Sequence, residues 1–239
     1  MNNSGAHLLK AALKYSFPVF LGYLTIGIAF GLVVVEAGFP WWIALLTSVV
    51  MYAGAGQFIA IGLFASGAGL PACMLIQLVV NARHMAYGLT MRKQFANAGP
   101  LKWYLIFSLS DETFALLSSM NDDIASREKR PRFLALVSLL DQLYWIAGSL
   151  TGALAGRLIP YTTEGVGFAL TALFVVLMIE QMLRVKKPAL FIIPAFAAVL
   201  CVIVLPSGLS LLAAMAFSLA AIQFFHLDAE KKDGAHAWH

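Results

Sequence analysis

The sequence predicts an all-α protein, a polytopic transmembrane helical bundle of about seven or eight membrane segments. Composition is the first reason: 61% of the 239 residues are hydrophobic and 12% are charged, whereas soluble domains average roughly 45–50% apolar and about 25% charged. The mean hydropathy of +0.83 is the second. The third is that apolar residues gather in runs near the ~20 residues that a helix needs to cross a bilayer. The net charge of +4 gives no indication of nucleic-acid binding.

Eight apolar runs are the predicted segments. They cover residues 16–36, 42–64, 70–91, 102–120, 133–156, 164–183, 189–205 and 209–226. The last two are short and lie on either side of Pro206-Ser207-Gly208, so they could form a hairpin that does not fully cross. We expect one integral membrane transporter domain over 1–239, with a cytoplasmic N-terminal segment over about 1–15 and a polar tail over 227–239.

The lysines and arginines of the loops predict the orientation. With eight spans and a cytoplasmic N-terminus, eleven of them fall inside and four outside, which favours both termini in the cytoplasm. The loop that carries Arg92, Lys93 and Lys102 falls outside, against this rule. Either segment two or segment three is re-entrant, or this loop tolerates the charge.

Glycines four residues apart mark two of the segments. Gly27 and Gly31 form such a pair in segment one, and Gly148, Gly152 and Gly156 form a double one in segment five. Glycine at this spacing lets helix backbones approach closely in lipid. The pattern predicts helix contacts, either at a moving or subunit interface or in ordinary static packing.

Segment two contains Tyr52-Ala53-Gly54-Ala55-Gly56-Gln57-Phe58. Two glycines and an amide in mid-span predict either a broken helix or a continuous helix whose glycines accept a neighbour. A break would expose backbone groups that line a cavity, and the N-terminus of a half-helix suits a carboxylate. Tyr52, Gly54, Gly56 and Gln57 are therefore candidate substrate-binding residues.

Segment three carries a polar cluster, Asn81-Ala82-Arg83-His84. An Arg at a helix centre costs ~3 kcal/mol on insertion scales, so Arg83 needs partners. It could bind a substrate carboxylate, pair with a membrane acid, or snorkel to the membrane edge. Asn81 and Arg83 are candidate substrate-binding residues. His84 titrates near neutral pH when unperturbed, so it is a candidate for proton coupling, with a structural hydrogen bond as the alternative.

Four acids lie in or near apolar runs: Asp111 and Glu112 in segment four, Asp141 in segment five and Glu180 in segment six. One of them could neutralise Arg83, and another could hold a substrate ammonium or a proton. Asp111, Glu112 and Asp141 are candidate substrate-binding residues. Asp111, Glu112 and Glu180 join His84 as candidates for proton coupling, although Glu180 could simply pair with Arg184 one turn on.

Short internal matches suggest an inverted repeat of three segments. Ala29-Phe30-Gly31-Leu32 parallels Thr113-Phe114-Ala115-Leu116, and Gln57-Phe58 parallels Gln142-Leu143. An odd number of spans would invert the second half relative to the first, as in many transporters.

Several motifs, in order, resemble the AzlC family, the large subunits of two-component branched-chain amino acid exporters. They cover most of the chain from about Phe17 to Leu205, although Thr25 stands where a second proline is expected in the first motif. The matching stretches are Gly22-Tyr23-Leu24-Thr25-Ile26-Gly27-Ile28-Ala29-Phe30-Gly31, Tyr52-Ala53-Gly54-Ala55-Gly56-Gln57-Phe58, Asn81-Ala82-Arg83-His84, Asp111-Glu112-Thr113-Phe114 and Phe168-Ala169-Leu170-Thr171-Ala172-Leu173-Phe174.

The resemblance implies a multi-pass protein of the bacterial cytoplasmic (inner) membrane that exports valine, leucine and isoleucine, with methionine as a further candidate. It also implies a small membrane partner resembling AzlD. No nucleotide-binding loop, zinc motif or serine nucleophile elbow is visible, so no cofactor is expected and the proton gradient is the expected driving force. Two alternatives remain: an intramembrane enzyme that uses His84, Asp111 and Asp141, and a structural or regulatory subunit of a membrane complex.

Overall fold

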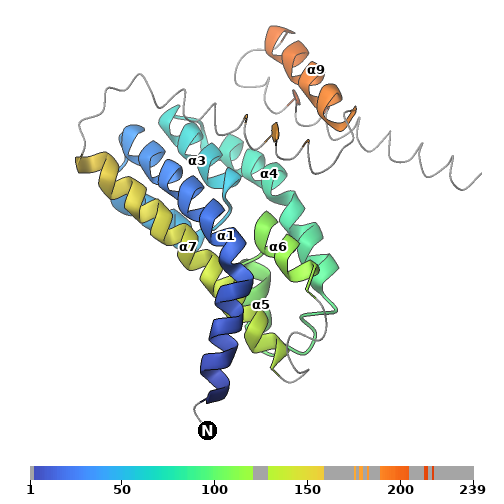
Figure 1. The fold of residues 1–239 in the computed structure, drawn as a ribbon. Coiled ribbons are helices and arrows are strands. Elements are labelled where there is room, and N and C mark those ends of the chain that lie inside the picture. Colours follow the sequence, from blue (N-terminus) through green and yellow to red (C-terminus); the bar gives the residue numbers. More distant parts are fainter. Residues whose placement is uncertain are drawn as a thin grey trace, which may run out of the picture. The chain divides into compact units, whose positions relative to one another are not determined.

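A computed structural model describes residues 3–120, 129–158, 175, 178–179, 182, 189–204, 213–214 and 217. The chain divides into two compact units, Met1–Thr171 and Ala172–His239. Every element defined in the described residues is a helix, which confirms the predicted all-α class. Figure 1 shows these helices along the chain.

The second unit contains α9, Ala189–Val204, which confirms the apolar segment predicted at 189–205. This helix carries Pro194 in its interior. The segments predicted at 164–183 and 209–226 lie almost entirely outside the described residues.

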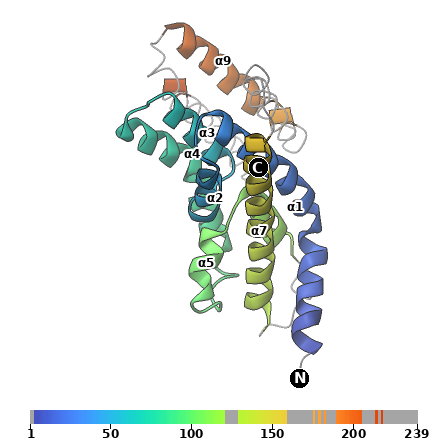
Figure 2. The same ribbon diagram turned by 90° about the vertical axis from the view of Figure 1, so that its left-hand side faces the viewer.

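Two long helices form the core of the first unit: α1, Asn3–Glu36, and α7, Arg130–Leu158. Both are long and apolar enough to cross a bilayer. They lie side by side in Figures 1 and 2. Tyr15 contacts Phe133 near the start of both helices, and Gly156 lies against Leu32 near their ends, so α1 and α7 run in the same direction.

The predicted glycine pairs face each other in this contact. The Cα atom of Gly148 lies 3.1 Å from the position of a Cβ built on Gly27. A Cβ built on Gly31 would meet the backbone oxygen of Ser149, and one built on Gly152 would meet the backbone oxygen of Ile28. The absence of side chains at these positions lets the two backbones touch, as the small-residue spacing predicts.

Segment two is broken. It forms two short helices, α2, Trp41–Val50, and α3, Ala55–Ala65, joined by residues 51–54. We call this pair the first hairpin and residues 51–54 its tip. The end of α2 contacts the middle of α7, where Ser48 donates a hydrogen bond to Ser149 at 3.0 Å. The chain then returns toward the end of α1, where Phe58 packs on Phe30 at 5.2 Å between ring centroids.

Backbone geometry shows why the helix breaks here. Tyr52 has a φ of 40° and Gly54 a φ of 31°, both outside the helical region. Glycine accepts such a value readily, whereas a bulky residue does so at a cost of about 1–3 kcal/mol. Tyr52 is 3% exposed, so the surrounding packing holds the strained tip in place.

The helix α4, Leu70–Met91, has the bounds predicted for segment three. It begins beside the end of α3, where the Cys73 thiol lies 3.6 Å from the carbonyl oxygen of Ala68. It ends at Met91, in a buried cluster with Ala12 of α1. The helix therefore runs antiparallel to α1.

The prediction of one continuous span at 102–120 is wrong. This segment forms α5, Leu101–Phe107, and α6, Asp111–Ser118, which we call the second hairpin, with residues 108–110 as its tip. The Ser110 side chain accepts a hydrogen bond from the backbone nitrogen of Thr113 at 3.1 Å and so begins α6 as its N-cap. At the far end of α6, the Leu116 carbonyl oxygen accepts a hydrogen bond from Tyr15 at 3.4 Å.

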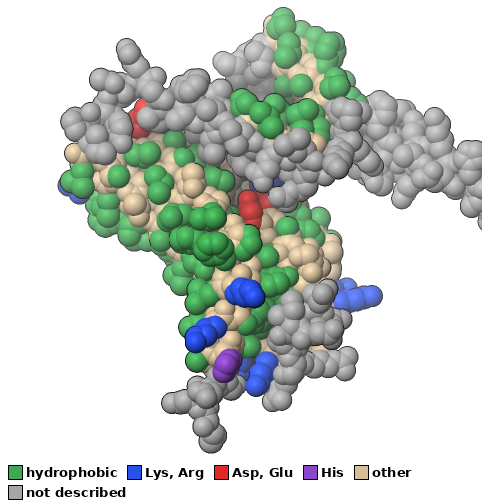
Figure 3. Space-filling model, viewed as in Figure 1, with side chains coloured by type: hydrophobic (Ala, Val, Ile, Leu, Met, Phe, Trp, Pro, Cys, Tyr) green, Lys and Arg blue, Asp and Glu red, His purple; other side chains and the backbone are tan. Residues whose placement is uncertain are grey.

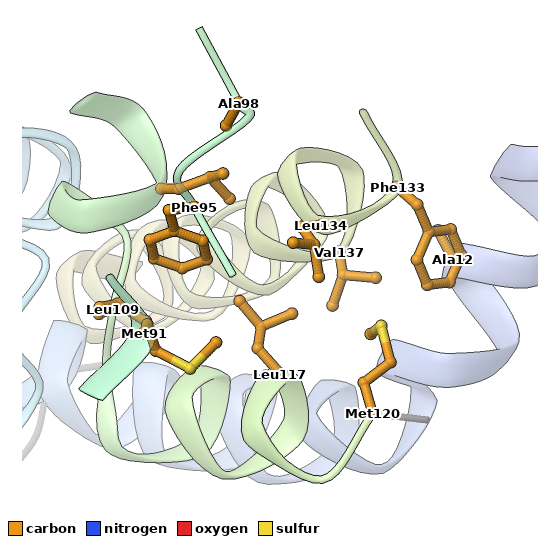
Figure 4. Close-up of a cluster of buried hydrophobic side chains, with 11 residues drawn as sticks. Ala12, Met91, Phe95, Ala98, Leu109, Leu117, Met120, Phe133, Leu134 and Val137 are labelled. Atoms are coloured by element: carbon orange, nitrogen blue, oxygen red, sulfur yellow. The ribbon is translucent and has the colours of Figure 1, made fainter. Parts of the chain in front are cut away.

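A buried apolar cluster holds the base of the second hairpin. Figure 4 shows Leu109 and Leu117 of the hairpin packed with Ala12 of α1 and Leu134 of α7. Leu117, Phe133 and Leu134 are among its members that are almost fully buried. The second hairpin therefore enters from the end where α1 begins, whereas the first hairpin enters from the end where α1 finishes.

The internal correspondence in the structure differs from the predicted three-segment repeat. The two broken segments are two and four, whereas segment five is the continuous helix α7. The order along the chain is α1, the first hairpin, the antiparallel helix α4, and then the second hairpin, which enters from the opposite end. The short sequence matches paired segment one with segment four and segment two with segment five. A match between short stretches does not show in which direction each helix runs.

The outer surface of the first unit is apolar. Figure 3 shows hydrophobic side chains over much of the visible described surface, with Lys and Arg gathered toward the end where α1 begins. Leu89 is 73% exposed and Trp103 is 76% exposed. Apolar surface of this extent marks a membrane or protein contact rather than a face in water.

Candidate functional site

The tips of the two hairpins meet beside Tyr23, in the middle of α1. The Tyr23 ring lies 6.4 Å from the ring of Tyr52 in the first tip. Its hydroxyl forms a hydrogen bond with Ser110 in the second tip and donates another to Glu112 Oε2 at 2.9 Å. Trp145 of α7 packs on the other edge of Tyr23, at 5.4 Å between ring centroids. Tyr23 therefore joins both breaks to the α1–α7 core.

Asp141 is the buried carboxyl at this junction. It is 0% exposed, and its Oδ2 accepts a hydrogen bond from Thr113 at 2.9 Å. Its Oδ1 has no hydrogen-bond partner among the described residues. The buried Tyr52 hydroxyl lies nearby and interacts with Thr113, Tyr23 and Asp141. Buried polar atoms of this kind are rare in folded proteins and require an explanation such as a ligand.

Amide side chains organise the first tip. The Gln57 side chain accepts a hydrogen bond from the Ala53 nitrogen at 3.2 Å. Gln77 of α4 donates to the Gly56 carbonyl oxygen at 2.9 Å, and Asn81 donates to the Gln77 side chain at 2.9 Å. A Cβ at Gly56 would lie 2.9 Å from Asn81 Oδ1, so glycine is needed for this close approach. Of the predicted substrate-binding residues, Gly56 of segment two and Asn81 of segment three thus lie against each other.

Gln142 of α7 joins the two hairpins. Its Nε2 donates to the carbonyl oxygen of Val49, near the end of α2, at 3.3 Å. Its Oε1 accepts a hydrogen bond from Tyr104 of α5 at 2.9 Å. A side chain of the continuous helix thereby satisfies one of the carbonyl groups that a helix end leaves free.

Arg83 pairs with Asp111, the first residue of α6. Nη1 of Arg83 lies 2.8 Å from Oδ2 of Asp111, and Tyr87 donates to Oδ1 at 2.8 Å. The two charged side chains are 38% and 37% exposed. Of the alternatives for Arg83, the structure shows the pairing with a membrane acid, and it identifies Asp111 as that acid.

This ion pair predicts non-additive effects of mutation. We expect Arg83→Gln and Asp111→Asn each to lower the melting temperature of the purified protein, because each leaves one charge without its partner. The double variant should lose less than the two single losses together. Melting curves of the three variants in the same detergent measure this, and strictly additive losses would contradict a coupled pair.

His84 lies apart from the tips. It lines a cavity of about 350 Å³ together with Arg92 and Lys102. Its ring lies 5.8 Å from that of Tyr87, the residue that binds Asp111. Its role in proton coupling stays a prediction. Glu180, the other candidate outside the tips, lies outside the described residues.

Three residues of the junction were missed by sequence reasoning as site residues: Tyr23, Ser110 and Thr113. Ser110 carried a usable signal, because a serine followed by acids in the first turn is typical of a helix start. Tyr23 stands inside an apolar stretch and Thr113 directly after two acids, and the role of each depends on packing between distant segments. Within the described part of the chain, no group of three or more His, Cys, Asp and Glu residues is placed to hold a metal ion.

Comparison with known proteins identifies the family. A family model described as AzlC protein matches residues 18–159, which contain the whole junction of the two tips. The chain belongs to the AzlC family. The model ends before the motif at 168–174, so it covers less of the chain than the stretch from Phe17 to Leu205 over which the resemblance was read.

Relatives of this AzlC-family chain share most of its length. The branched-chain amino acid transport protein AzlC of Bacillus subtilis is 36% identical over 74% of this chain and 69% of its own length. An uncharacterized membrane protein of Helicobacter pylori is 37% identical over 92% of this chain and 96% of its own. The inner membrane protein YgaZ of Escherichia coli is 25% identical over 75% and 76%. No solved structure matches the chain.

Proposed function

We propose that this AzlC-family protein exports valine, leucine, isoleucine and methionine across the bacterial cytoplasmic membrane. The proton gradient drives export, and a small AzlD-like membrane subunit takes part. The observation that carries the proposal is the free Oδ1 of the buried Asp141, between the tips of two opposed hairpins. Broken helices that meet near the bilayer midplane are the usual place for substrate in secondary transporters. The name of the Bacillus subtilis relative supports the substrate class.

The packing supports a definite membrane topology. We assign α1, α4 and α7 as crossings and both hairpins as re-entrant, because α1 and α7 are parallel with an antiparallel α4 between them in sequence. This assignment moves the loop of Arg92, Lys93 and Lys102 to the side of the N-terminus. Basic residues at the end where α1 begins then favour a cytoplasmic N-terminus. They are Lys10, Lys14, Arg92, Lys93, Lys102, Lys129, Arg130 and Arg132.

Cysteine labelling tests this topology. In a background with Cys73 and Cys201 replaced by alanine, we expect Lys93→Cys to react with a membrane-impermeant thiol reagent in inside-out vesicles and not in right-side-out vesicles. Arg157→Cys, at the far end of α7, should show the reverse. Both positions are exposed in the structure. Labelling of Lys93→Cys from the outside would instead make segment two a full crossing.

A substrate of this class needs three kinds of contact. It is a zwitterion with an aliphatic side chain, so it needs a partner for its ammonium, a partner for its carboxylate and an apolar wall. Oδ1 of Asp141 is the ammonium partner, and the N-terminus of α3 at Gly54 attracts the carboxylate. Tyr52 and Trp145 supply aromatic surface beside them. Arg83 is assigned a structural role, because its Nη1 pairs with Asp111.

Competition for Asp141 couples substrate to protons. A charged Asp141 binds an ammonium group, whereas a protonated Asp141 does not attract it. A proton that enters from outside therefore displaces substrate, and the site exchanges one for the other. This arrangement gives antiport without any nucleotide.

Export of preloaded radiolabelled leucine tests the proposal. Cells that express this chain with its small partner should lower internal leucine against a gradient, and a protonophore should stop this. Cells with the empty vector are the control. Leucine efflux no faster than the control, with the protein verified in the membrane, would reject the substrate assignment. Efflux that continues with the protonophore present would reject proton coupling.

A further inference from the structure

Two carboxyl groups are joined by an unbroken chain of hydroxyl groups at the tip of the second hairpin. Glu112 Oε2 lies 2.9 Å from the Tyr23 hydroxyl, which is hydrogen-bonded to Ser110. Ser110 Oγ lies 3.0 Å from Thr113 Oγ1, which lies 2.9 Å from Asp141 Oδ2. The chain links α1, α6 and α7.

Counting hydrogens shows what this chain requires. It contains four oxygen-to-oxygen contacts, and each needs one hydrogen. Tyr23, Ser110 and Thr113 have one hydroxyl hydrogen each. The backbone nitrogen of Thr113 also donates to Ser110 Oγ, but this hydrogen lies outside the four contacts. The fourth hydrogen must come from a carboxyl group at one end of the chain.

We propose that Glu112 and Asp141 together hold one proton and pass it between them through Tyr23, Ser110 and Thr113. When Glu112 is protonated, it donates to Tyr23, Tyr23 to Ser110, Ser110 to Thr113 and Thr113 to Asp141. Each hydroxyl then passes its hydrogen one step along. Glu112 ends as a carboxylate, Asp141 ends as a carboxylic acid, and each hydroxyl keeps one hydrogen with its direction reversed.

Geometry at the two ends fits a relay. Glu112 is partly exposed, so its end of the chain exchanges protons with its surroundings. Asp141 is fully buried beside the first tip, where its free Oδ1 is the proposed ammonium partner. The relay therefore rests on the proposed antiport for its function. The count of hydrogens in the chain does not depend on that proposal.

Other ionisable groups face the chain from the neighbouring helices. Tyr52 at the first tip and Tyr104 of α5 interact electrostatically with Asp141. Asp111 and Arg83 interact with Glu112. Because the Arg83–Asp111 pair is internally neutral, it favours neither end of the chain strongly.

Infrared spectroscopy of the purified full-length protein tests the shared proton without any transport. The carbonyl stretch of a protonated carboxyl should persist at neutral pH in the wild type. Tyr23→Phe should shift this band to a higher frequency, because it breaks the chain and leaves a protonated Glu112 without its hydroxyl partner. Tyr15→Phe is the matched control in the same helix, since its hydroxyl binds the Leu116 carbonyl outside the chain. The band should disappear in the double variant Glu112→Gln with Asp141→Asn.

A second pair of variants guards against misfolding. Thr113→Val should likewise shift the band, and Thr113→Ser should leave it as in the wild type, because serine restores the hydroxyl in a residue of similar size. In vesicles, Thr113→Val should lower proton-driven leucine export by about a hundredfold, within the range that positioned proton transfer contributes.

The outcomes separate the relay from the transport proposal. A band absent from the wild type at neutral pH, or unchanged in frequency in folded Tyr23→Phe and Thr113→Val, would overturn the shared proton. A band that behaves as expected without leucine transport would keep the relay and reject the proposed substrate.

Discussion

Asp141→Asn should abolish proton-driven leucine export while leaving the protein folded. Asparagine has the shape of the carboxyl group and still accepts the Thr113 hydrogen bond, but it neither carries the charge nor binds the proton. Removing one partner from a buried charge pair typically costs 2–5 kcal/mol. We therefore expect leucine export to fall at least about a hundredfold, measured in vesicles with an imposed proton gradient.

The melting temperature distinguishes a loss of export caused at the site from a loss caused by unfolding. Asp141 is fully buried and its Oδ1 is without a hydrogen-bond partner among the described residues. Replacing an incompletely paired buried carboxyl with a neutral amide should leave the melting temperature unchanged or raise it. Ser138→Ala is the matched control, one turn earlier on α7 at a buried hydroxyl that also lacks a hydrogen-bond partner. Export equal to wild type in Asp141→Asn would make this carboxyl purely structural.

Gly31→Ala should strongly destabilise the first unit. The new Cβ would meet backbone atoms of Ser149 and Ala153, which cannot rotate away as a side chain could. The two helices must separate along their length, and forced overpacking typically costs 1–3 kcal/mol. We expect a loss of about 3 kcal/mol, seen as a lower melting temperature and a lower yield of monodisperse protein in detergent.

Gly22→Ala is the control for this substitution. It lies in the same helix, two turns and more before Gly31, and a Cβ there meets nothing within 4 Å. Alanine is a better helix former than glycine by about 1 kcal/mol, so Gly22→Ala should be neutral or stabilising. Equal melting temperatures for the two variants would contradict the close α1–α7 contact.

Sequence alone predicted the features that depend on local pattern. The α4 and α9 segments have nearly the predicted bounds because each is one predominantly apolar stretch whose helix is not broken. The glycine spacing predicted a close helix contact, and Gly27 and Gly148 indeed lie against each other. The break near Gly54 was one of two alternatives, since two glycines permit a break without requiring it.

Features that depend on the direction of a helix, or on contacts between distant segments, were harder to predict from the sequence. Hydropathy does not distinguish one span of 19 residues from two short helices that turn back, so the second hairpin was missed. Ser110 followed by two acids carries the signal of a helix start inside this run. The partner of Arg83 could not be chosen among four acids, because α4 and α6 come together only in the folded bundle.

The parallel α1–α7 contact also constrains how the chain enters the membrane. Its contacts are far apart in sequence, since Ser16 and Tyr144 are separated by 128 residues. The first hairpin also depends on α7, through the contact of Ser48 with Ser149, 101 residues on. The hairpin helices of 10, 11, 7 and 8 residues are too short to cross a bilayer alone. Their broken backbones are tolerated in lipid only when protein covers them. Both hairpins can therefore take their places in the membrane only after α7 has been synthesised. Until then, the insertion machinery or the membrane–water interface must shield them.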